Sequence, residues 1–235
     1  MSETKGNKMK VLFIIPAYNE QENIERVIES IKEKCPEYDY IIVNDGSKDG
    51  TEEVCLKNGY HFLSHPVNMG LAAAVQTGML YAMKNGYDAA IQFDGDGQHD
   101  PAYVASMAKQ IEAGYNIVIG SRFVTEKKPH SMRMLGSNLI EFAVKLTTGK
   151  TIKDPTSGMR MYDKKTIKKL ALGSDLGPEP DTVALLIRHG ATFKEVQVEM
   201  HERIAGQSYL NFSSSINYML RMFVSILILQ WFRKG

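Results

Sequence analysis

Cysteine is scarce in this sequence, with only Cys35 and Cys55 among 235 residues. The two do not form a C-x-x-C pair, and residues 1–10 are polar, without the apolar region that a signal peptide carries. Both observations favour the reducing cytoplasm as the compartment of this protein.

Two glycine-rich phosphate-binding motifs are missing. No G-x-G-x-x-G follows the first apolar run, and G-x-x-x-x-G-K-[ST] occurs nowhere in the chain. The first absence argues against a dinucleotide-dependent dehydrogenase, and the second argues against a P-loop enzyme.

The chain is long enough to form one substantial core. With 43% hydrophobic residues, it is expected to form one domain, alone or with an extension. The net charge is +1, but the first 117 residues carry 10 Lys+Arg and 17 Asp+Glu, whereas the remaining residues carry 18 and 10. The basic second half favours an anionic partner, and we expect no nucleic acid among the partners.

Short apolar runs alternate with stretches of helical spacing in the first half. Strands are predicted over 10–15, 40–43, 61–64, 89–93 and 116–120, and helices over about 21–34 and 71–84. This alternation predicts an α/β protein with a doubly wound, mostly parallel sheet, whose ligands gather beyond the carboxyl ends of the strands. The polar residues expected at those ends are Tyr18, Glu20, Asp45, Asp94, Asp96 and Arg122.

The stretch 88–101 carries the clearest chemical signal. Asp94 and Asp96 directly follow an apolar run and are separated by a glycine. Two hard oxygen ligands at a strand end suit Mg²⁺ or Mn²⁺, and an ion held by so few protein ligands keeps positions open for substrate phosphates. Gln98 could add a third oxygen ligand.

A purely structural interpretation of this stretch is a polar turn. In that case Asp100 would cap a helix that begins near Pro101. A calcium loop of the EF-hand type is not favoured, because the later glycine and glutamate of that loop are missing.

A series of short motifs occurs in a fixed order along the chain. They are Pro16-Ala17-Tyr18-Asn19-Glu20, Asn44-Asp45-Gly46-Ser47, Asn68-Met69-Gly70, Asp94-Gly95-Asp96-Gly97-Gln98-His99, Gly120-Ser121-Arg122-Phe123, Asp154-Pro155-Thr156-Ser157-Gly158 with Arg160, and Glu202-Arg203-Ile204-Ala205-Gly206-Gln207-Ser208. Their order and spacing resemble glycosyltransferase family 2. Within that family the chain most resembles the dolichyl- or polyprenyl-phosphate sugar synthases, over roughly residues 10–210.

The resemblance implies a GT-A fold and an inverting transfer from a nucleotide sugar. By matching position, the residues that would bind the donor nucleotide are Pro16, Ala17, Tyr18, Glu20, Asp45 and Asp94. The residues that would bind the metal ion at the diphosphate of the donor nucleotide are Asp94, Asp96 and Gln98. Those that would bind an acceptor phosphate are Arg122, Arg133, Ser137 and Arg203. A UDP-hexose is preferred over GDP-mannose, and the absence of Q-x-x-R-W implies transfer of one sugar without processivity.

The chemistry depends on the acceptor. A phosphate monoester has a second pKa of about 6 and is largely a dianion at pH 7, so it needs positioning by arginines and no general base. The residues predicted to be catalytic are Asp96, Asp154, Arg122 and Arg203. Asp154 could orient an arginine, or it could act as the base for a hydroxyl acceptor, and Glu179 and Asp181 could do the same.

The leading hypothesis is therefore a metal-dependent transferase that moves one sugar to polyprenyl phosphate, undecaprenyl or dolichyl, at the cytoplasmic face of a membrane. One alternative uses the same fold and donor but transfers to a hydroxyl of a glycan, glycolipid or protein. A second alternative is a non-catalytic nucleotide-sugar-binding protein. It predicts a degraded metal motif, whereas Asp94 and Asp96 are both present.

The last residues predict a helical extension. We expect a flexible N-terminus over 1–9, the transferase domain over 10–210 and an amphipathic or apolar helix over 211–235. Its uninterrupted low-charge part, 222–232, is shorter than the ~20 apolar residues that span a bilayer. A polar stripe recurs every four residues at Asn217, Arg221 and Ser225. This helix could lie on the inner membrane surface, dock on its own core or pack in a homo-oligomer.

Overall fold

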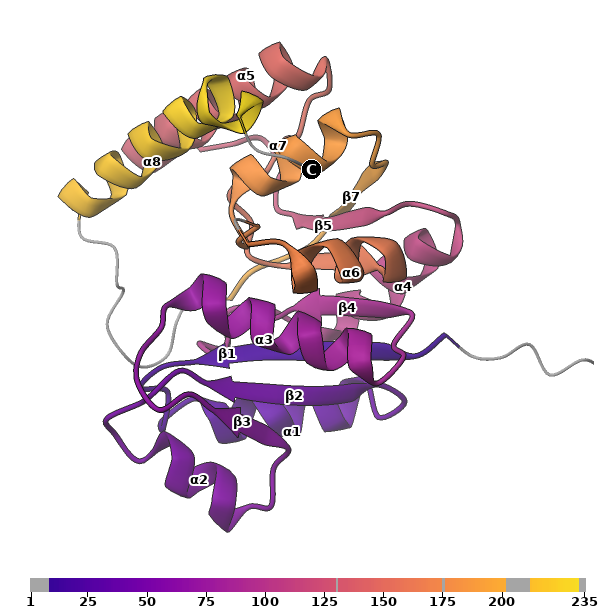
Figure 1. Cartoon of the computed structure of the whole chain (residues 1–235), viewed down its shortest axis with the longest axis vertical. Coiled ribbons are helices and arrows are strands. Elements are labelled where there is room, and N and C mark those ends of the chain that lie inside the picture. The colour runs from indigo at the N-terminus through magenta and orange to yellow at the C-terminus, as the bar shows by residue number, and fades with distance from the viewer. Residues whose placement is uncertain (1–8, 130, 175, 202–211, 233–235) are drawn as a thin grey trace, which may run out of the picture.

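The computed structural model describes residues 9–129, 131–174, 176–201 and 212–232 (Figure 1). In this part of the chain, one seven-stranded sheet has the order β3-β2-β1-β4-β6-β5-β7. The strands are β1 (Val11–Ala17), β2 (Asp39–Asn44), β3 (Phe62–Ser64), β4 (Ala89–Gln92), β5 (Ile117–Ser121), β6 (Arg160–Asp163) and β7 (Phe193–Gln197). All neighbouring strands are parallel except at β6, which is antiparallel to both β4 and β5. The predicted α/β class with a mostly parallel sheet is confirmed.

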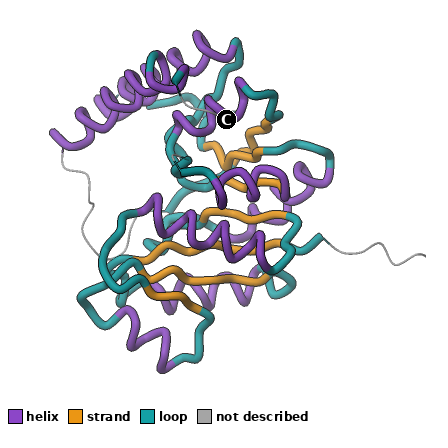
Figure 2. Tube along the Cα trace, viewed as in Figure 1, coloured by secondary structure: helices purple, strands orange, loops and turns teal. Residues whose placement is uncertain are grey.

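Helices cover both faces of the sheet (Figure 2). They are α1 (Ile24–Lys34), α2 (Thr51–Lys57), α3 (Leu71–Lys84), α4 (Val104–Glu112), α5 (Met132–Thr148), α6 (Lys164–Leu172), α7 (Pro180–Arg188) and α8 (Phe212–Leu227), with the 3-10 turns η1 (Pro101–Tyr103) and η2 (Leu229–Trp231). Because side chains alternate across a strand, the buried residues of β1 divide between two cores. Val11, Phe13 and Ile15 pack with α1 and α4, whereas Leu12 and Ile14 pack with α3 and α5.

The five predicted strands all form, within two residues of the predicted bounds. The helix predicted over about 21–34 begins later, at Ile24, because residues 18–23 form the turn after β1. The polar-turn interpretation of residue 100 is also correct. The Asp100 side chain accepts a hydrogen bond from the Ala102 N–H and caps η1.

Helix α8 packs against α5 and α7, and Figure 1 shows it running alongside α5. Met222 and Ile226 are buried in the same core as α3 and α5. Of the predicted polar stripe, Ser225 is buried against α7, where its hydroxyl donates to the buried Asp181 carboxylate at 2.5 Å, whereas Asn217 and Arg221 are exposed. The docked helix is therefore continuous with the core of the domain.

The outer side of α8 keeps large apolar side chains in contact with solvent, among them Leu220, Val224 and Ile228. At its end the Trp231 ring stacks on the Arg188 guanidinium at 3.7 Å. Within the described residues, no helix combines the length and the apolar character needed to cross a bilayer.

Candidate active site

The loops that carry the sequence motifs meet at one edge of the sheet. β1, β2, β4 and β5 all end there, because they run in the same direction. The antiparallel β6 begins at that edge, which brings residues 154–160 to the same place. Gly158 lies so close to Asp94 that a Cβ built on it would be within 2.4 Å of the Asp94 carboxylate. A side chain at position 158 would have to displace the Asp94 carboxylate.

Residues 94–98, which we call the metal loop, are held by local hydrogen bonds. The Asp94 N–H donates to Nδ1 of the buried His99 at 3.4 Å, and Nε2 of the same ring lies 3.9 Å from the Asp94 carboxylate. The Gln98 N–H donates to the Asp96 carboxylate at 3.1 Å. The Gln98 side-chain amide donates to the His201 carbonyl at 3.4 Å, which joins the metal loop to the segment after β7. His99 thus helps to orient Asp94.

The donor atoms of the metal loop fit a divalent cation that also binds phosphate. Among the residues described, no group of three or more His, Cys, Asp and Glu side chains could hold a metal by itself. Asp94 and Asp96 supply hard oxygens on a loop whose glycines leave little bulk beside them. Mg²⁺ is commonly bound in this way, through one or two carboxylates and the phosphates of a substrate.

The loops after β1 and β2 are connected by hydrogen bonds between backbone N–H groups and side-chain oxygens. The Asn19 side chain accepts from the Lys48 N–H at 2.8 Å, and the Glu20 N–H donates to the Thr51 hydroxyl at 2.9 Å. Asn19 has a positive φ of 56°, which an asparagine tolerates better than most residues. The Pro16 carbonyl faces Gly95, at 3.1 Å from a Cβ built there. Of the predicted donor-binding residues, Pro16 and Glu20 therefore adjoin the metal loop, and Ala17 and Tyr18 lie between them in the sequence.

Asp45, predicted to bind the nucleotide, is buried at the end of β2. Its carboxylate accepts from the N–H groups of Met69 and Gly70 at 2.9 and 2.8 Å. His65 lies between this carboxylate, at 2.7 Å, and the Thr77 hydroxyl, at 2.9 Å. Asp45 thus fixes the turn that leads into α3. The prediction missed His65, although its place directly after the strand 61–64 was a usable signal.

Arg122 and Asp154 form a two-point ion pair. Nε and Nη2 of Arg122 each donate to one Asp154 oxygen at 2.7 Å, and the Arg122 N–H donates to the same carboxylate at 3.1 Å. Asp154 is 0% exposed, whereas the Arg122 side chain remains 19% exposed. The contact that would let Asp154 orient Arg122 is therefore present, and a catalytic role for Asp154 stays a prediction.

The loop that carries Asp154 is supported from two directions. The Glu195 carboxylate on β7 accepts from the N–H groups of Lys153 and Asp154, both at 2.9 Å. The buried Arg160 donates to the carbonyls of Pro155 and Pro178 at 2.7 and 2.6 Å. These contacts fix the loop and so fix the direction in which Arg122 is held.

The other predicted acceptor-binding residues are not assembled around Arg122 in the described part of the chain. Ser137 on α5 is fully buried, and its hydroxyl has no hydrogen-bond partner among the described residues. Arg133 falls in the first turn of α5, but its side chain lies outside the described residues, as does all of Arg203. The roles proposed for these three residues stay predictions.

The two candidate bases lie at the start of α7. Glu179 is at its N-cap position, 4.0 Å from the Arg221 guanidinium of α8, and Asp181 accepts from Ser225. Buried in this cluster, the Tyr218 hydroxyl has its pKa raised to about 12, mainly because desolvation disfavours the phenolate. The cluster attaches α8 to the domain, and a role for either carboxylate as a base stays a prediction.

Comparison with known proteins points to one family. The family model described as Glycosyl transferase family 2 matches residues 12–171. The chain is 28% identical to the polyprenol monophosphomannose synthase of Mycolicibacterium smegmatis over 226 residues, which cover 91% of this chain and 85% of that protein. It is 32% identical to the UDP-N-acetylglucosamine–dolichyl-phosphate N-acetylglucosaminyltransferase of Methanococcus voltae over 183 residues, covering 68% of this chain and 72% of that one.

Among solved structures, the chain resembles glucosyl-3-phosphoglycerate synthase from Mycobacterium tuberculosis in complex with Mn²⁺, UDP-glucose and phosphoglyceric acid. The TM-score is 0.66 at 17% identity, with 97% of this chain and 82% of that chain covered. At this identity the likeness shows a shared fold, and it confirms the predicted GT-A class.

Proposed function

The chain belongs to glycosyltransferase family 2, and from that premise we propose that it transfers one sugar, with inversion, from a nucleotide sugar to polyprenyl phosphate. The observation that carries this proposal is the Arg122–Asp154 pair. It presents a fixed guanidinium, with N–H groups to spare, held by the loop 154–158, whose Gly158 lies against the Asp94 carboxylate. Such an arginine suits a phosphate acceptor, because charge-assisted hydrogen bonds to phosphate are strong and directional.

The same pair argues against a hydroxyl acceptor with Asp154 as base. Its carboxylate already accepts three hydrogen bonds from Arg122 and is buried. A base must lie within hydrogen-bond reach of the proton that it removes, which this carboxylate could do only by giving up Arg122. An acceptor that is already a dianion needs no such base.

For the donor we propose a UDP-hexose in preference to GDP-mannose. The two hydrogen-bonded loops, 16–20 and 45–51, would bind the nucleotide. Asp94, Asp96 and Gln98 would bind Mg²⁺ or Mn²⁺. When bound, the ion supplies Lewis-acid stabilisation of the charge that develops on the leaving diphosphate. Asp96 would face that diphosphate, and Arg122 with Arg203 would orient the acceptor phosphate for attack on the anomeric carbon.

We also propose contact with the inner membrane surface through the outer faces of α5 and α8. The support is a set of exposed large apolar side chains on two helices that pack together: Leu135, Phe142, Leu146, Leu220, Val224 and Ile228. A bilayer at this face would let the prenyl chain stay in lipid while its phosphate enters the site. Flotation of the protein with anionic phospholipid vesicles tests this contact. The alternative occupant, a second copy of the chain, would instead appear as a stable dimer.

The transfer proposal is tested by incubating the protein with Mn²⁺, a short-chain polyprenyl phosphate and a panel of radiolabelled UDP- and GDP-sugars. We expect label from one donor to enter the organic phase, and EDTA to abolish that transfer. Metal-dependent donor hydrolysis without lipid labelling would contradict the phosphate acceptor. It would favour transfer to a hydroxyl, with Glu179 or Asp181 as the base.

A further inference from the structure

We propose that Arg26 is a positioning residue that braces the metal loop from the side of α1 and connects it to Glu20 in the turn after β1. Arg26 belongs to none of the motifs that pointed to the family. The inference rests on the proposed function in one respect, namely that the metal loop binds a divalent cation.

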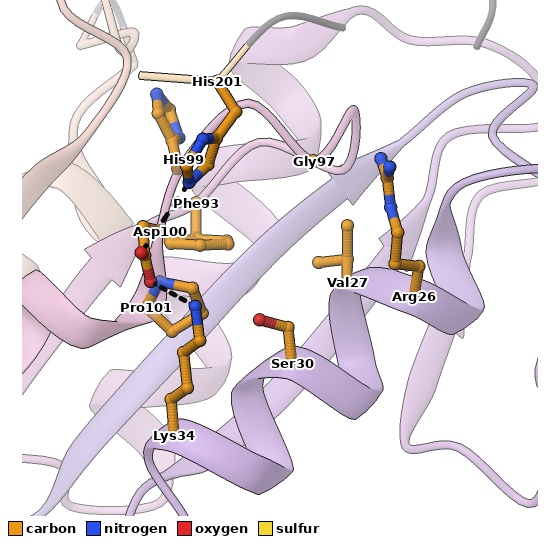
Figure 3. A pocket seen from close by; sticks show the side chains of 10 residues that line it. All are labelled: Arg26, Val27, Ser30, Lys34, Phe93, Gly97, His99, Asp100, Pro101 and His201. Carbon is orange, nitrogen blue, oxygen red and sulfur yellow. Dashed lines mark hydrogen bonds and ion pairs between the residues drawn. The ribbon is translucent and has the colours of Figure 1, made fainter. Parts of the chain in front are cut away.

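The first part of the argument is the contact between Arg26 and the loop. Figure 3 shows Arg26 rising from α1 towards Gly97. Nη2 of Arg26 lies 3.5 Å from the Asp96 carbonyl, and a Cβ built on Gly97 would be 2.2 Å from Nη2 and 3.1 Å from Cζ. The guanidinium therefore packs directly against the loop. Gly97 has a positive φ of 75°, so a side chain there would be strained as well as blocked.

The second part is a chain of polar contacts along α1. The same Nη2 lies 3.5 Å from the Asn23 side-chain oxygen, and the Asn23 amide donates to the Glu20 carboxylate at 2.7 Å. Asn23 and Glu20 are both buried, so this connection is shielded from water. Each contact at 3.5 Å is weak by itself. The positioning role of Arg26 depends on these two contacts together with its packing against Gly97. Through Asn23, the contacts connect Glu20 to the backbone of Asp96, a proposed metal ligand.

The third part is an open cavity beneath the loop. A cavity of about 180 Å³ lies there, bordered by Gly97 and His99 above and by Arg26, Ser30 and Lys34 of α1 below (Figure 3). Lys34 does not support the loop, because its ammonium pairs with Asp100 at 2.9 Å. Truncating Arg26 would extend the cavity to the Asp96 carbonyl and leave this side of the loop without its packed neighbour.

The brace should affect metal binding more than folding. Arg26 is only partly buried, so its loss should change global stability little. Outer residues that hold metal ligands in place typically change metal affinity by about 10- to 100-fold when mutated. We expect Arg26→Ala to fall near the lower limit, because Asp94 and Asp96 themselves remain.

The experiment measures Mn²⁺ binding directly, by the loss of the free-ion electron paramagnetic resonance signal, with UDP and separately with GDP present. The variants are Arg26→Ala, Arg26→Lys and, as the matched control, Lys34→Ala from the same side of α1 and the same cavity. We expect Arg26→Ala to bind Mn²⁺ about tenfold more weakly, with a melting temperature within a few degrees of wild type. Arg26→Lys should lie in between, and Lys34→Ala should stay within about twofold of wild type.

If Arg26→Ala binds Mn²⁺ as tightly as the wild type, the proposed role of Arg26 is wrong. It is also wrong if Lys34→Ala loses as much Mn²⁺ affinity as Arg26→Ala. If Arg26→Ala does not fold, Arg26→Lys decides the question, since it keeps the charge and the apolar stem but loses the planar contact with Gly97. Failure of the wild-type protein to bind Mn²⁺ with either nucleotide would remove the metal-dependent function and the brace together. Normal wild-type binding with unchanged variants would remove the brace alone.

Discussion

The proposed donor side and the proposed acceptor side of this molecule are held together by different kinds of contact. Around residues 16–20, 45–51 and 94–98, short loops are joined to one another by hydrogen bonds between side chains and backbone. Around α5, α7 and α8, the contacts are mainly between apolar side chains, with a polar attachment at Asp181 and Ser225. The first arrangement fixes positions before a ligand arrives. The second leaves large apolar side chains exposed on its outer surface.

The largest effect is expected on the donor side. Asp96→Ala should lower both donor hydrolysis and transfer by about 10²-fold, the scale seen when one preorganised group that stabilises transition-state charge is removed. Radiolabel assays over a range of Mn²⁺ concentrations measure the loss. Asp88→Ala, an exposed carboxylate paired with Lys164, is the control and should keep wild-type rates. Retained hydrolysis in Asp96→Ala would contradict the metal site.

The Arg122–Asp154 ion pair offers a sharper test of whether donor binding and acceptor binding are separate. Arg122→Ala should lower kcat/KM for polyprenyl phosphate by about 10- to 100-fold, because hydrogen bonds to a charged partner contribute about 1.5–3 kcal/mol. Donor affinity, measured by calorimetry with UDP, should stay unchanged. Asp154→Asn should show a smaller loss of the same kind, since the arginine remains but is held less firmly. Equal losses for donor and acceptor would mean that the two regions do not act separately.

Introducing charged residues on the exposed apolar surface of α5 should weaken membrane association. Introducing Phe142→Asp and Leu146→Asp together should weaken association with anionic vesicles by about tenfold or more, because burial of each apolar side chain contributes about 1.5–3 kcal/mol. Leu56→Asp on α2 is a matched control, since Leu56 is 63% exposed and Leu146 is 65% exposed. A dimer that dissociates in the double variant, without vesicle binding in the wild type, would assign this surface to a second copy.

The attachment of α8 should contribute measurably to stability. Ser225→Ala removes the hydroxyl that donates to the buried Asp181, and a buried acceptor that loses a partner costs about 1 kcal/mol or more. Urea denaturation should show this loss, whereas Asn217→Ala, at an exposed position on the same stripe, should change little. A neutral Ser225→Ala would indicate that apolar contacts alone hold α8.

The smallest effect concerns the two buried thiols, Cys35 at the end of α1 and Cys55 in α2. Burial raises the pKa of Cys35 and of Cys55 to about 11. Both should resist iodoacetamide at pH 8 in the folded protein and react in denaturant. Because the folded pKa is the higher one, their contribution to stability is complete below about pH 9 and is lost as the pH rises towards 11. Fast native labelling would contradict this burial.

The donor side was largely predictable because its features are local. Each parallel strand is a short apolar run, and the polar residues that follow it arrive at one edge for topological reasons. β6 and β7 were not predicted, since β6 is a four-residue strand with charged residues at both ends and β7 is a polar strand at the sheet edge. Neither pattern differs clearly from a loop.

Long-range pairing limited the prediction of the acceptor side. Asp154 was given two possible roles, because nothing in the sequence shows that Arg122, 32 residues earlier, is its partner. The polar stripe of the last helix was recognised, but the partner of Ser225 on α7 was not. Asp45 was expected to contact the nucleotide. In the structure its carboxylate also accepts hydrogen bonds from the N–H groups of Met69 and Gly70.

The Arg122–Asp154 pair also has a consequence for how this domain can vary. The chain leaves the sheet after β5 and returns at β6, its immediate neighbour, so the excursion through α5 starts and ends at almost the same place. The Arg122–Asp154 ion pair joins the two ends of this segment, because Arg122 directly follows β5 and Asp154 comes shortly before β6. The inner side of this segment is tied to the shared core through Ile140, Ala143 and Val144. Its exposed outer surface, with Phe142 and Leu146, is where its sequence can diverge without changing that core.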